Sequence, residues 1–420
     1  MDENRNKEQL NQLKALICHT YENEKLSVQA VIDACDKLSK SLHERQHLTL
    51  LTDVGIPEYK AREELQIVKY MMSREYLEKR LELELGTKTE WVLPNVASTK
   101  KVQQKYRPLG VLLHIAAGNV DALPVFSVIE GLITGNINLL KLPGQDNGLS
   151  IWILQKLIQY YPLIANYVVV FDYPSEDIES MKKMADAADA IVVWGGDTAV
   201  SAVRKLAKPN TKIIEWGHKI SFAYVSGKNI ADDELEKIAY NICDTNQLFC
   251  NSCQGIYVDT DDFEEVIVFA QRFCRILDSK SQSMPQQDDL YIHAQKTLEC
   301  STEELEAINT GNKSVFRTKN CGVIAYNNSL LEPSYMFRNC WVKPLPKNRL
   351  LIEMIGYKNH LQTVALVCEE EDRQEFEDIF FHTGVVRITN GENMSKSYCG
   401  IAHDGDFALR RYMKVVSCEY

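Results

Sequence analysis

Apolar positions in the first part of the chain recur three or four residues apart among charged side chains, as Leu10, Leu13 and Ile17 show. This period is typical of amphipathic helices that bury one face. We therefore expect residues 1–104 to form a helical N-terminal region. After Arg107 the pattern changes to short, wholly apolar runs that alternate with stretches of helical period.

Runs that are apolar throughout predict strands buried on both faces, and their alternation with helices predicts a parallel sheet covered by helices. In residues 105–217 the expected strands are PLGVLLHIAA, NINLLKL, YVVVFDY, AIVVWGG and TKIIEWG. The helices expected between them are VDALPVFSVIEGLITG, LSIWILQKLIQYY, DIESMKKMADAAD and TAVSAVRKLAK. This segment is predicted to be a doubly wound α/β domain.

A second α/β run begins near Lys219 with the strand KISFAYV, the helix DDELEKIAYNICDTNQLF, the strand GIYV and the helix DFEEVIVFAQRFCRIL. We assign residues 218–395 to this second α/β domain, although residues 280–345 show no readable alternation. Residues 396–420 form a C-terminal segment whose ending, YMKVVSCEY, is expected to be a strand.

Ligands of such sheets bind outside the carboxyl ends of the strands, where turns lead into helices. The turns expected there are AAGNVDA, KLPGQDNG, DYPSED and WGGDTA. None of them has the glycine pattern of a common dinucleotide fingerprint or of a P-loop. The architecture nevertheless suits a nucleotide.

Composition narrows the classes of function. The chain has 420 residues, 45% hydrophobic and 25% charged, with a formal net charge of -11. This charge provides no global positive field for nucleic acid or an anionic membrane surface. The charged start and the lack of an apolar run near the roughly 18 residues of a membrane span lead us to expect a cytoplasmic protein.

The chain has twelve cysteines, and two of them, Cys250 and Cys253, form a C-x-x-C pair. A structural zinc site needs four ligands, and no second pair exists, although Cys243 could supply a third thiolate. A redox dithiol needs its first cysteine at the start of a helix, whereas this pair follows a helix and precedes a strand. Two packed thiols, or a single nucleophile beside an oxyanion-binding backbone N–H, remain open.

Ordered landmarks over residues 105–420 resemble the aldehyde dehydrogenase superfamily, and within it the LuxC-type acyl-CoA reductases, the fatty acid reductase component of bacterial luminescence. HIAAGNVDALP is similar to the segment with the oxyanion-hole asparagine, which implies that role for Asn119. GLITGNINLLKL resembles the helix and strand that end in a cofactor-binding lysine, here Lys141. VVWGGD resembles the turn on the nicotinamide side of the cofactor, at Gly195 and Gly196.

Three further landmarks follow in the expected order. IIEWGHK stands in place of a Glu-Leu-Gly-Gly-Lys motif, which implies that Glu215 is the catalytic glutamate. NQLFCNSCQ resembles Gln-x-x-Cys-x-Ser-x-Gln, which implies that Cys250 is the nucleophile and Cys253 a neighbour. IEMIG resembles the segment whose glutamate holds the nicotinamide ribose, here Glu353. Glu215 and Cys250 are 35 positions apart, and Cys250 and Glu353 are 103 apart, close to the spacing of the superfamily.

The residue types suit these roles on physical grounds. A thiolate attacks thioesters readily, and an amide such as that of Asn119 can donate to the developing oxyanion, although a Gly-Asn pair is also common in turns. Glu215 at a strand end could equally be a solvated carboxylate. A lysine such as Lys141 at the end of a buried strand needs an anionic or hydroxyl partner, for example a ribose or a phosphate.

Three features depart from the superfamily pattern. His218 replaces the second glycine of Glu-Leu-Gly-Gly-Lys, where an imidazole could tune proton transfer or simply pack. The stretch Asn-Gln-Leu-Phe before Cys250 differs from that of the hydrolytic enzymes. Gly144 stands where members that prefer NAD often carry a glutamate that repels a 2′-phosphate, so NADPH is expected and NADH remains possible.

The resemblance implies an NAD(P)-binding domain at 105–217 and a catalytic domain at 218–395. It implies reduction of a fatty acyl-CoA or another acyl thioester to the aldehyde through an acyl group on Cys250. It also implies an acyl-protein synthetase partner and a homo-oligomer that pairs the C-terminal strand with a neighbour. Two alternatives stay open. One is another activity of the superfamily, on short acyl-CoA, acyl phosphate or aldehyde, and the other is a non-catalytic redox- or metal-responsive protein that uses Cys243, Cys250 and Cys253.

Overall fold

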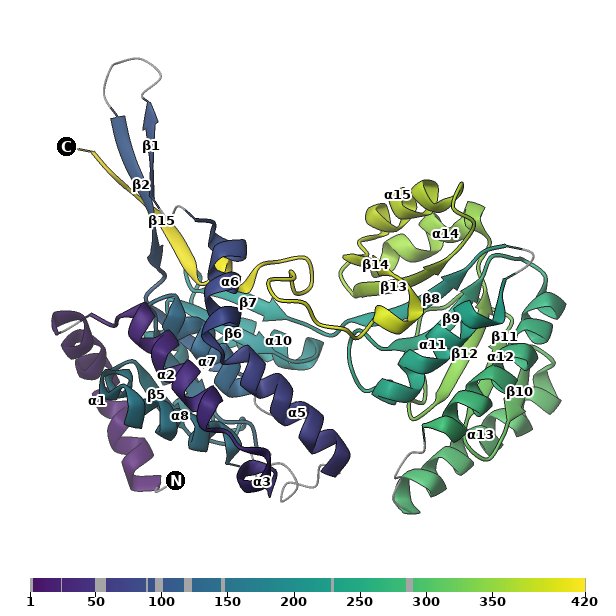
Figure 1. The fold of residues 1–420 in the computed structure, drawn as a ribbon, viewed down its shortest axis with the longest axis horizontal. Helices are drawn as coiled ribbons and strands as arrows, with labels where there is room; N and C mark the ends of the chain where they lie inside the picture. The colour runs from purple at the N-terminus through teal and green to yellow at the C-terminus, as the bar shows by residue number, and fades with distance from the viewer. Residues whose placement is uncertain are drawn as a thin grey trace. The chain divides into compact units, whose positions relative to one another are not determined.

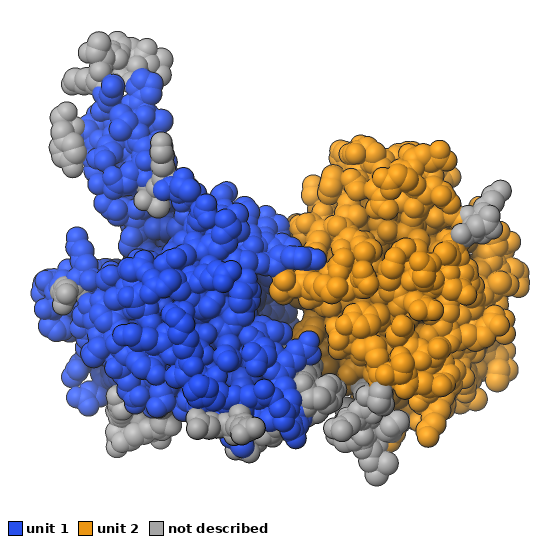
Figure 2. All heavy atoms as spheres, viewed as in Figure 1, with its two compact units in different colours: residues 1–217, 398–420 blue, residues 218–397 orange. Residues whose placement is uncertain are grey.

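The computed structural model describes residues 3–23, 25–49, 58–87, 90–94, 101–116, 123–144, 148–227, 230–284 and 290–419. The chain divides into two compact units (Figures 1 and 2). Unit 1 contains Met1–Gly217 together with Tyr398–Tyr420, and unit 2 contains His218–Ser397. Sheets and buried clusters lie within one unit or the other: the five-stranded and three-stranded sheets in unit 1, and the seven-stranded sheet in unit 2.

The main sheet of unit 1 has five strands in the order β5-β4-β3-β6-β7, all parallel. Its strands are β3 (Val111–Ile115), β4 (Ile137–Lys141), β5 (Val168–Phe171), β6 (Ala190–Trp194) and β7 (Lys212–Trp216). Its helices are α7 (Leu123–Ile133), α8 (Leu149–Tyr160), α9 (Ile178–Ala187) and α10 (Asp197–Leu206), with the short 3₁₀ turn η1 (Pro162–Asn166). The predicted doubly wound sheet is confirmed, and its strand order reverses between β3 and β6, where such sheets bind ligands.

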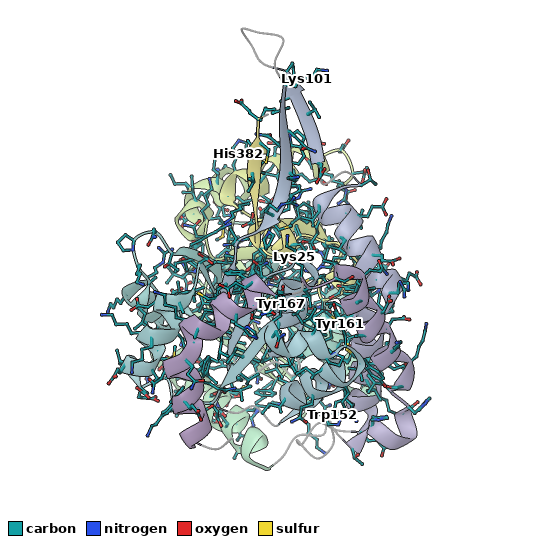
Figure 3. All side chains as sticks on the ribbon, turned by 90° about the vertical axis from the view of Figure 1, so that its left-hand side faces the viewer. Lys25, Lys101, Trp152, Tyr161, Tyr167 and His382 are labelled. Atoms are coloured by element: carbon teal, nitrogen blue, oxygen red, sulfur yellow. The ribbon has the colours of Figure 1, made fainter. Side chains whose placement is uncertain are left out.

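The N-terminal helices share one core with this sheet. They are α1 (Glu3–Glu22), α2 (Val28–Ser41), α3 (Glu44–His47), α5 (Glu58–Met71) and α6 (Arg74–Leu85). Leu13 and Val31 belong to the same buried cluster as Leu139 of β4. Tyr161 and Tyr167, labelled in Figure 3, accept hydrogen bonds from the backbone at the start of α2, from Ser27 at 3.3 Å and from Leu26 at 3.1 Å.

Three buried polar side chains form a hydrogen-bonded group within unit 1. His114 of β3 shares hydrogen bonds with Ser127 of α7 at 2.7 Å and with Asn138 of β4 at 3.0 Å. Burial lowers the pKa of His114 to about 4, because the protein interior disfavours the charged ring. The imidazole is therefore neutral near pH 7.

A separate antiparallel sheet joins the C-terminal strand to the strands that follow the N-terminal helices. It has the order β1-β2-β15, with β1 (Glu90–Pro94), β2 (Lys101–Pro108) and β15 (Met413–Cys418). The predicted C-terminal strand is confirmed. It pairs with β2 of its own chain, and its other edge lies at the border of the sheet. Pairing with a neighbouring chain stays a prediction.

The sheet of unit 2 has seven strands in the order β10-β11-β12-β9-β8-β13-β14, parallel except for β10 against β11. The strands are β8 (Ile220–Val225), β9 (Cys253–Val258), β10 (Lys313–Arg317), β11 (Gly322–Tyr326), β12 (Asn339–Pro344), β13 (Leu361–Val367) and β14 (Arg387–Thr389). Residues 280–345, which the sequence left unassigned, supply β10, β11 and β12 and the whole of α13 (Leu290–Thr310).

Helices cover both faces of this second sheet (Figure 1). They are α11 (Asp232–Thr245), α12 (Phe263–Ser283), α13 (Leu290–Thr310), α14 (Lys347–Met354) and α15 (Arg373–Thr383). One core lies between the sheet and α11 and α12, and the other lies under α14 and α15. The remaining short elements are η2 (Ile355–Tyr357), η3 (Gly391–Asn393) and α16 (Ala408–Arg411). Within the described ranges, no helix is both long and apolar enough to cross a membrane.

Candidate active site

Cys250 lies in a tight loop between α11 and β9. The helix ends at Thr245, four residues before the end that the sequence pattern suggested. Asn246 and Gln247 then take left-handed backbone conformations, with φ of 47° and 63°. Asparagine tolerates this conformation and often ends helices for that reason.

Cys250 is an exposed residue, and an amide donor lies beside its thiol. Gln362, buried at the start of β13, donates from Nε2 to the Cys250 Sγ at 3.3 Å. The hydroxyl of Ser221 on β8 donates to the Cys250 carbonyl at 2.7 Å and accepts from the backbone N–H of Thr363 at 3.0 Å. A donor aimed at sulfur favours the thiolate, which is the nucleophilic form.

Cys253 has the opposite environment. Its side chain is fully buried, and the thiol donates to the Gly255 carbonyl at 3.3 Å. Burial raises the pKa of the Cys253 thiol to about 12. Of the two cysteines in the C-x-x-C pair, Cys250 is therefore the one placed to react with a molecule from solvent.

The polar residues around Cys250 hold the shape of the loop. Gln247 donates to the carbonyl of Cys253 at 3.0 Å, and Gln254 donates back to the Gln247 carbonyl at 3.0 Å. Ser252 accepts from the backbone N–H of Phe249 at 3.1 Å. The glutamines and serine of the Gln-x-x-Cys-x-Ser-x-Gln pattern thus have a structural explanation, because each one fixes backbone around the cysteine.

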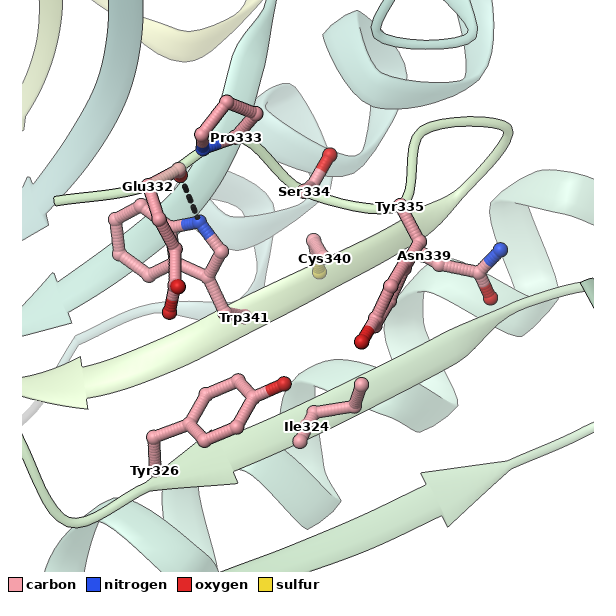
Figure 4. A pocket seen from close by; sticks show the side chains of 9 residues that line it. All are labelled: Ile324, Tyr326, Glu332, Pro333, Ser334, Tyr335, Asn339, Cys340 and Trp341. Carbon is pink, nitrogen blue, oxygen red and sulfur yellow. Dashed lines mark hydrogen bonds between the residues drawn. The ribbon is translucent and has the colours of Figure 1, made fainter. Parts of the chain in front are cut away.

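A cavity of about 150 Å³ lies on unit 2 (Figure 4). It is lined by Ile324, Tyr326, Glu332, Pro333, Ser334, Tyr335, Asn339, Cys340 and Trp341. Ser334 donates from its hydroxyl to Gln254 at 2.8 Å. One wall of the cavity is therefore hydrogen-bonded to Gln254 of β9, four residues after Cys250.

Lys141, at the carboxyl end of β4, is 4% exposed. Its ammonium donates to the Ser175 hydroxyl at 3.0 Å. Burial lowers the pKa of Lys141, while the nearby carboxylates of Glu176 and Asp172 act in the opposite direction. A buried ammonium with a neutral oxygen partner can take further hydroxyl or phosphate oxygens, which fits a nucleotide ligand.

Gly195 and Gly196 form the turn from β6 into α10. Gly196 is the N-cap residue of this ten-residue helix and has no side chain to cap it. A Cβ atom on Gly195 would lie 3.0 Å from the Ala199 Cβ, so the turn leaves little room for a side chain there. Asn119, the predicted oxyanion donor, lies outside the described residues.

Glu215 on β7 is engaged in an ion pair with Arg204 of α10. Its side chain is 29% exposed and that of Arg204 is 61% exposed. The Arg411 guanidinium also donates to the Glu215 backbone carbonyl at 3.2 Å. The pair involves only Oε1 of the carboxylate, and exposed pairs of this kind exchange partners at small cost.

Glu353 on α14 pairs with Arg349 one helical turn earlier. His218 is exposed at the start of unit 2. Unit 1 thus gathers Lys141, Gly195 and Glu215 at the carboxyl ends of its parallel strands. Unit 2 carries Cys250 and Glu353.

The cysteines of the metal-responsive alternative do not share one environment. Cys243 is buried and shares a hydrogen bond with the Ser281 hydroxyl at 3.4 Å, whereas Cys250 is exposed. In the part of the chain that the structure describes, no three His, Cys, Asp or Glu side chains are grouped as a metal site would need.

The residues near Cys250 that were not predicted from the sequence include Gln362 and Arg338. Gln362 stands 112 positions after Cys250, inside the apolar run LQTVALV, and nothing local marks it. Arg338 stands 91 positions after Gln247 and donates from its backbone N–H to the Gln247 side chain at 3.1 Å. Both contacts exist only because distant segments meet in the fold.

Comparisons with known proteins agree with this structure. The family described as acyl-CoA reductase (LuxC) matches residues 23–415. The long-chain acyl-protein thioester reductase of Vibrio harveyi is 24% identical over 319 residues, 74% of this chain and 65% of that protein. The match therefore spans just under two thirds of the length of this relative.

Solved structures share the fold at low sequence identity. A betaine aldehyde dehydrogenase from Staphylococcus aureus superimposes with a TM-score of 0.72 at 12% identity, over 99% of this chain and 88% of that one. A 3,6-anhydro-L-galactose dehydrogenase in complex with NAP gives 0.68 at 12% identity, over 100% and 92%. These likenesses confirm the predicted aldehyde-dehydrogenase-like fold. Because the family match extends over nearly the whole chain, the chain belongs to the acyl-CoA reductase (LuxC) family.

Proposed function

We propose that this chain reduces a fatty acyl-CoA or another long-chain acyl thioester to the aldehyde with NADPH, through an acyl group held on Cys250. The observation that carries the proposal is the exposed thiol of Cys250 with the Gln362 amide donated to it, beside a buried and hydrogen-bonded Cys253. Membership of the LuxC family and the name of the Vibrio harveyi relative support this choice of substrate.

In the first half-reaction, the Cys250 thiolate attacks the thioester carbonyl carbon and forms a new C–S bond. The Asn119 amide and the backbone N–H of Cys250 stabilise the oxyanion. The old C–S bond then breaks, and the carrier thiolate leaves and takes up a proton. Glu215 accepts the proton that the Cys250 thiol gives up, after its carboxylate separates from Arg204.

Lys141, the turn at Gly195 and Gly196, and Glu353 would hold the cofactor. The buried ammonium of Lys141 and the uncapped start of α10 at the switch point of the sheet suit its hydroxyl and phosphate groups. When bound, NADPH supplies the hydride that reduces the acyl carbonyl. Gly144 presents no carboxylate to a 2′-phosphate, which favours NADPH and leaves NADH possible.

The second half-reaction ends on protein groups alone. The reduced acyl group is a thiohemiacetal on Cys250, whose oxyanion the same donors stabilise. When it collapses, the C–S bond breaks, the aldehyde leaves, and the Cys250 thiolate is restored for another turnover. Gln362 stabilises that thiolate as the leaving group.

Partners follow from the same proposal. An acyl-protein synthetase would hand the acyl group to Cys250, as the family resemblance implies. The chain would also form a homo-oligomer through β15, whose outer edge lies at the border of its sheet. Edge strands of this kind can pair with a second copy.

The test uses a radiolabelled long-chain acyl-CoA without cofactor, followed by NADPH. Wild type and Cys253→Ala should both acquire stoichiometric label, and Cys250→Ala should acquire none. NADPH should then release the label as aldehyde, and oxidation of NADPH should be fastest with long acyl chains. Full labelling of Cys250→Ala, or faster turnover of short acyl-CoA, acyl phosphate or free aldehyde, would contradict the proposal.

A further inference from the structure

Met336, Phe337 and Arg338 adopt left-handed backbone conformations in succession, with φ of 60°, 49° and 71°. Residues with side chains rarely take this conformation, and three in a row are costly unless the surroundings hold them. The segment lies between the cavity wall at Ser334 and Tyr335 and the start of β12 (Figure 4). The backbone N–H of Asn339 donates to the Met336 carbonyl at 2.9 Å and closes the turn.

This turn is hydrogen-bonded to Asn246 and Gln247, the two left-handed residues that precede Cys250. The backbone N–H of Phe337 donates to the Asn246 carbonyl at 2.9 Å. The backbone N–H of Arg338 donates to the Gln247 side-chain oxygen at 3.1 Å, and its Nε donates to the Asn246 Oδ1 at 3.3 Å. The left-handed turn 336–338 thus supports the left-handed pair Asn246 and Gln247, which ends three residues before Cys250.

The Arg338 side chain explains what holds them. It is 3% exposed, and its guanidinium donates to the carbonyls of Ser281 at 3.2 Å, Met284 at 2.7 Å and Cys243 at 3.4 Å. These carbonyls belong to the C-terminal ends of α12 and α11. Carbonyl groups there lack helical partners and carry the negative end of the helix dipole, so a buried cation stabilises both ends at once.

The end of α11 is where the Cys250 loop begins, so a group that fixes this end also fixes the loop. Among the described residues, none of the hydrogen bonds of Arg338 goes to a carboxylate. The buried guanidinium is therefore satisfied by backbone carbonyls at the ends of α11 and α12, and these carbonyls in turn need the guanidinium as their donor. We propose that Arg338 is a positioning residue, which with the left-handed turn 336–338 holds the Cys250 loop so that its thiol meets Gln362.

The proposal rests on the proposed function only for its effect on turnover. Its primary readout is alkylation of Cys250 by iodoacetamide, measured by mass spectrometry across a pH series. Cys18 of α1 is also exposed and serves as an internal reference in the same sample. A chain that fails to reduce acyl-CoA still reports on the loop by this assay, so the two proposals can fail separately.

One matched pair tests the turn through Met336, a residue that is 38% exposed. Glycine takes a positive φ without strain, whereas valine is strongly disfavoured there. Met336→Gly should keep the ratio of Cys250 to Cys18 alkylation within about twofold of wild type. Met336→Val should lower that ratio about tenfold at neutral pH, as expected for a shift of about one unit in the rate–pH midpoint. Equal ratios for the two variants would overturn the proposal.

Arg338→Ala should lower the same ratio about tenfold, and low millimolar guanidinium should restore it while leaving Cys18 unchanged. Arg338→Lys, which keeps the charge but loses the planar fork, should recover it in part. If Arg338→Ala folds with an unchanged ratio, or guanidinium restores nothing, the positioning role is wrong. If Arg338→Ala does not fold, the Met336 pair decides alone.

Discussion

The hydrogen bond from Gln362 to Cys250 makes a quantitative prediction about the thiolate. Gln362→Met keeps the length of the side chain and removes both N–H donors. Hydrogen bonds to charged groups contribute about 1.5–3 kcal/mol. The Cys250 sulfur lies 3.3 Å from the amide and is exposed, so water replaces part of the interaction and about 1 kcal/mol should be lost.

A free energy of about 1.4 kcal/mol corresponds to a tenfold change, so about 1 kcal/mol corresponds to roughly 0.7 of a pH unit. The midpoint of the Cys250 alkylation profile should therefore move upward by about that amount, and the rate below the midpoint should fall about fivefold. Stopped samples with iodoacetamide, quantified by mass spectrometry on the Cys250 peptide, measure both quantities.

Matched variants separate this effect from general damage. Gln374→Met on the exposed surface of α15 changes the same residue type away from Cys250 and should leave the profile unchanged. Gln362→Glu, which places a carboxylate beside the sulfur, should shift the midpoint further in the same direction as Gln362→Met. A folded Gln362→Met protein whose profile superimposes on that of wild type would refute the reasoning, because the amide would then contribute nothing to the thiolate.

Three further predictions follow from single residues. Lys141→Met should raise the unfolding temperature without cofactor and abolish most of the increase that NADPH gives. Burial lowers the folded-state pKa of Lys141, so its protonation opposes folding from neutral pH up to its unfolded pKa. The stability of wild type should therefore rise with pH as the amine deprotonates. His114→Gln should make the free energy of unfolding less sensitive to acid. The folded pKa of His114 is about 4 and the unfolded value is 6.5, so wild type should lose up to about 3 kcal/mol of stability as the pH falls through this window. Urea unfolding at several pH values measures this difference. Arg204→Ala should change the free energy of unfolding by no more than about 1 kcal/mol, because its ion pair with Glu215 is exposed. It should not slow single-turnover acylation, whereas Glu215→Gln should slow it. Slower acylation by Arg204→Ala would assign Arg204 a direct role.

The alternation of apolar runs predicted the parallel core of unit 1 because those strands are buried on both faces. Val111–Ile115 and Ile137–Lys141 show no polar alternation to confuse with another element. The strands β1 and β2 were not predicted, since they lie in a small antiparallel sheet and are largely exposed or half-buried. Residues 280–345 were unreadable because β10 and β11 are antiparallel within an otherwise parallel sheet, and α13 is a weakly amphipathic helix.

Some residues of the candidate site could be predicted from the sequence, and their hydrogen-bond partners could not. Cys250, Lys141 and Glu215 could be proposed because strand ends and spacing mark them, and family resemblance gives each a role. The partners that modulate them come from elsewhere in the chain. Gln362 reaches Cys250 across 112 positions, and Arg338 reaches Asn246 across 92. A one-dimensional pattern carries no information on such pairs, because only the packed sheet decides which strand starts lie side by side.

The C-x-x-C spacing shows why chemistry follows environment more than sequence interval. Cys253 is the first residue of β9, so its side chain enters the core and its pKa rises with burial. Cys250 is three residues earlier, in a loop whose backbone must leave α11 through two left-handed residues. On that path Cys250 stays exposed, while Ser221 donates to its carbonyl and Gln362 donates to its sulfur. Arg338 holds the preceding Gln247 through its backbone N–H. A single nucleophile needs one exposed cysteine on a fixed loop, and the hydrogen bonds around Cys250 provide that arrangement.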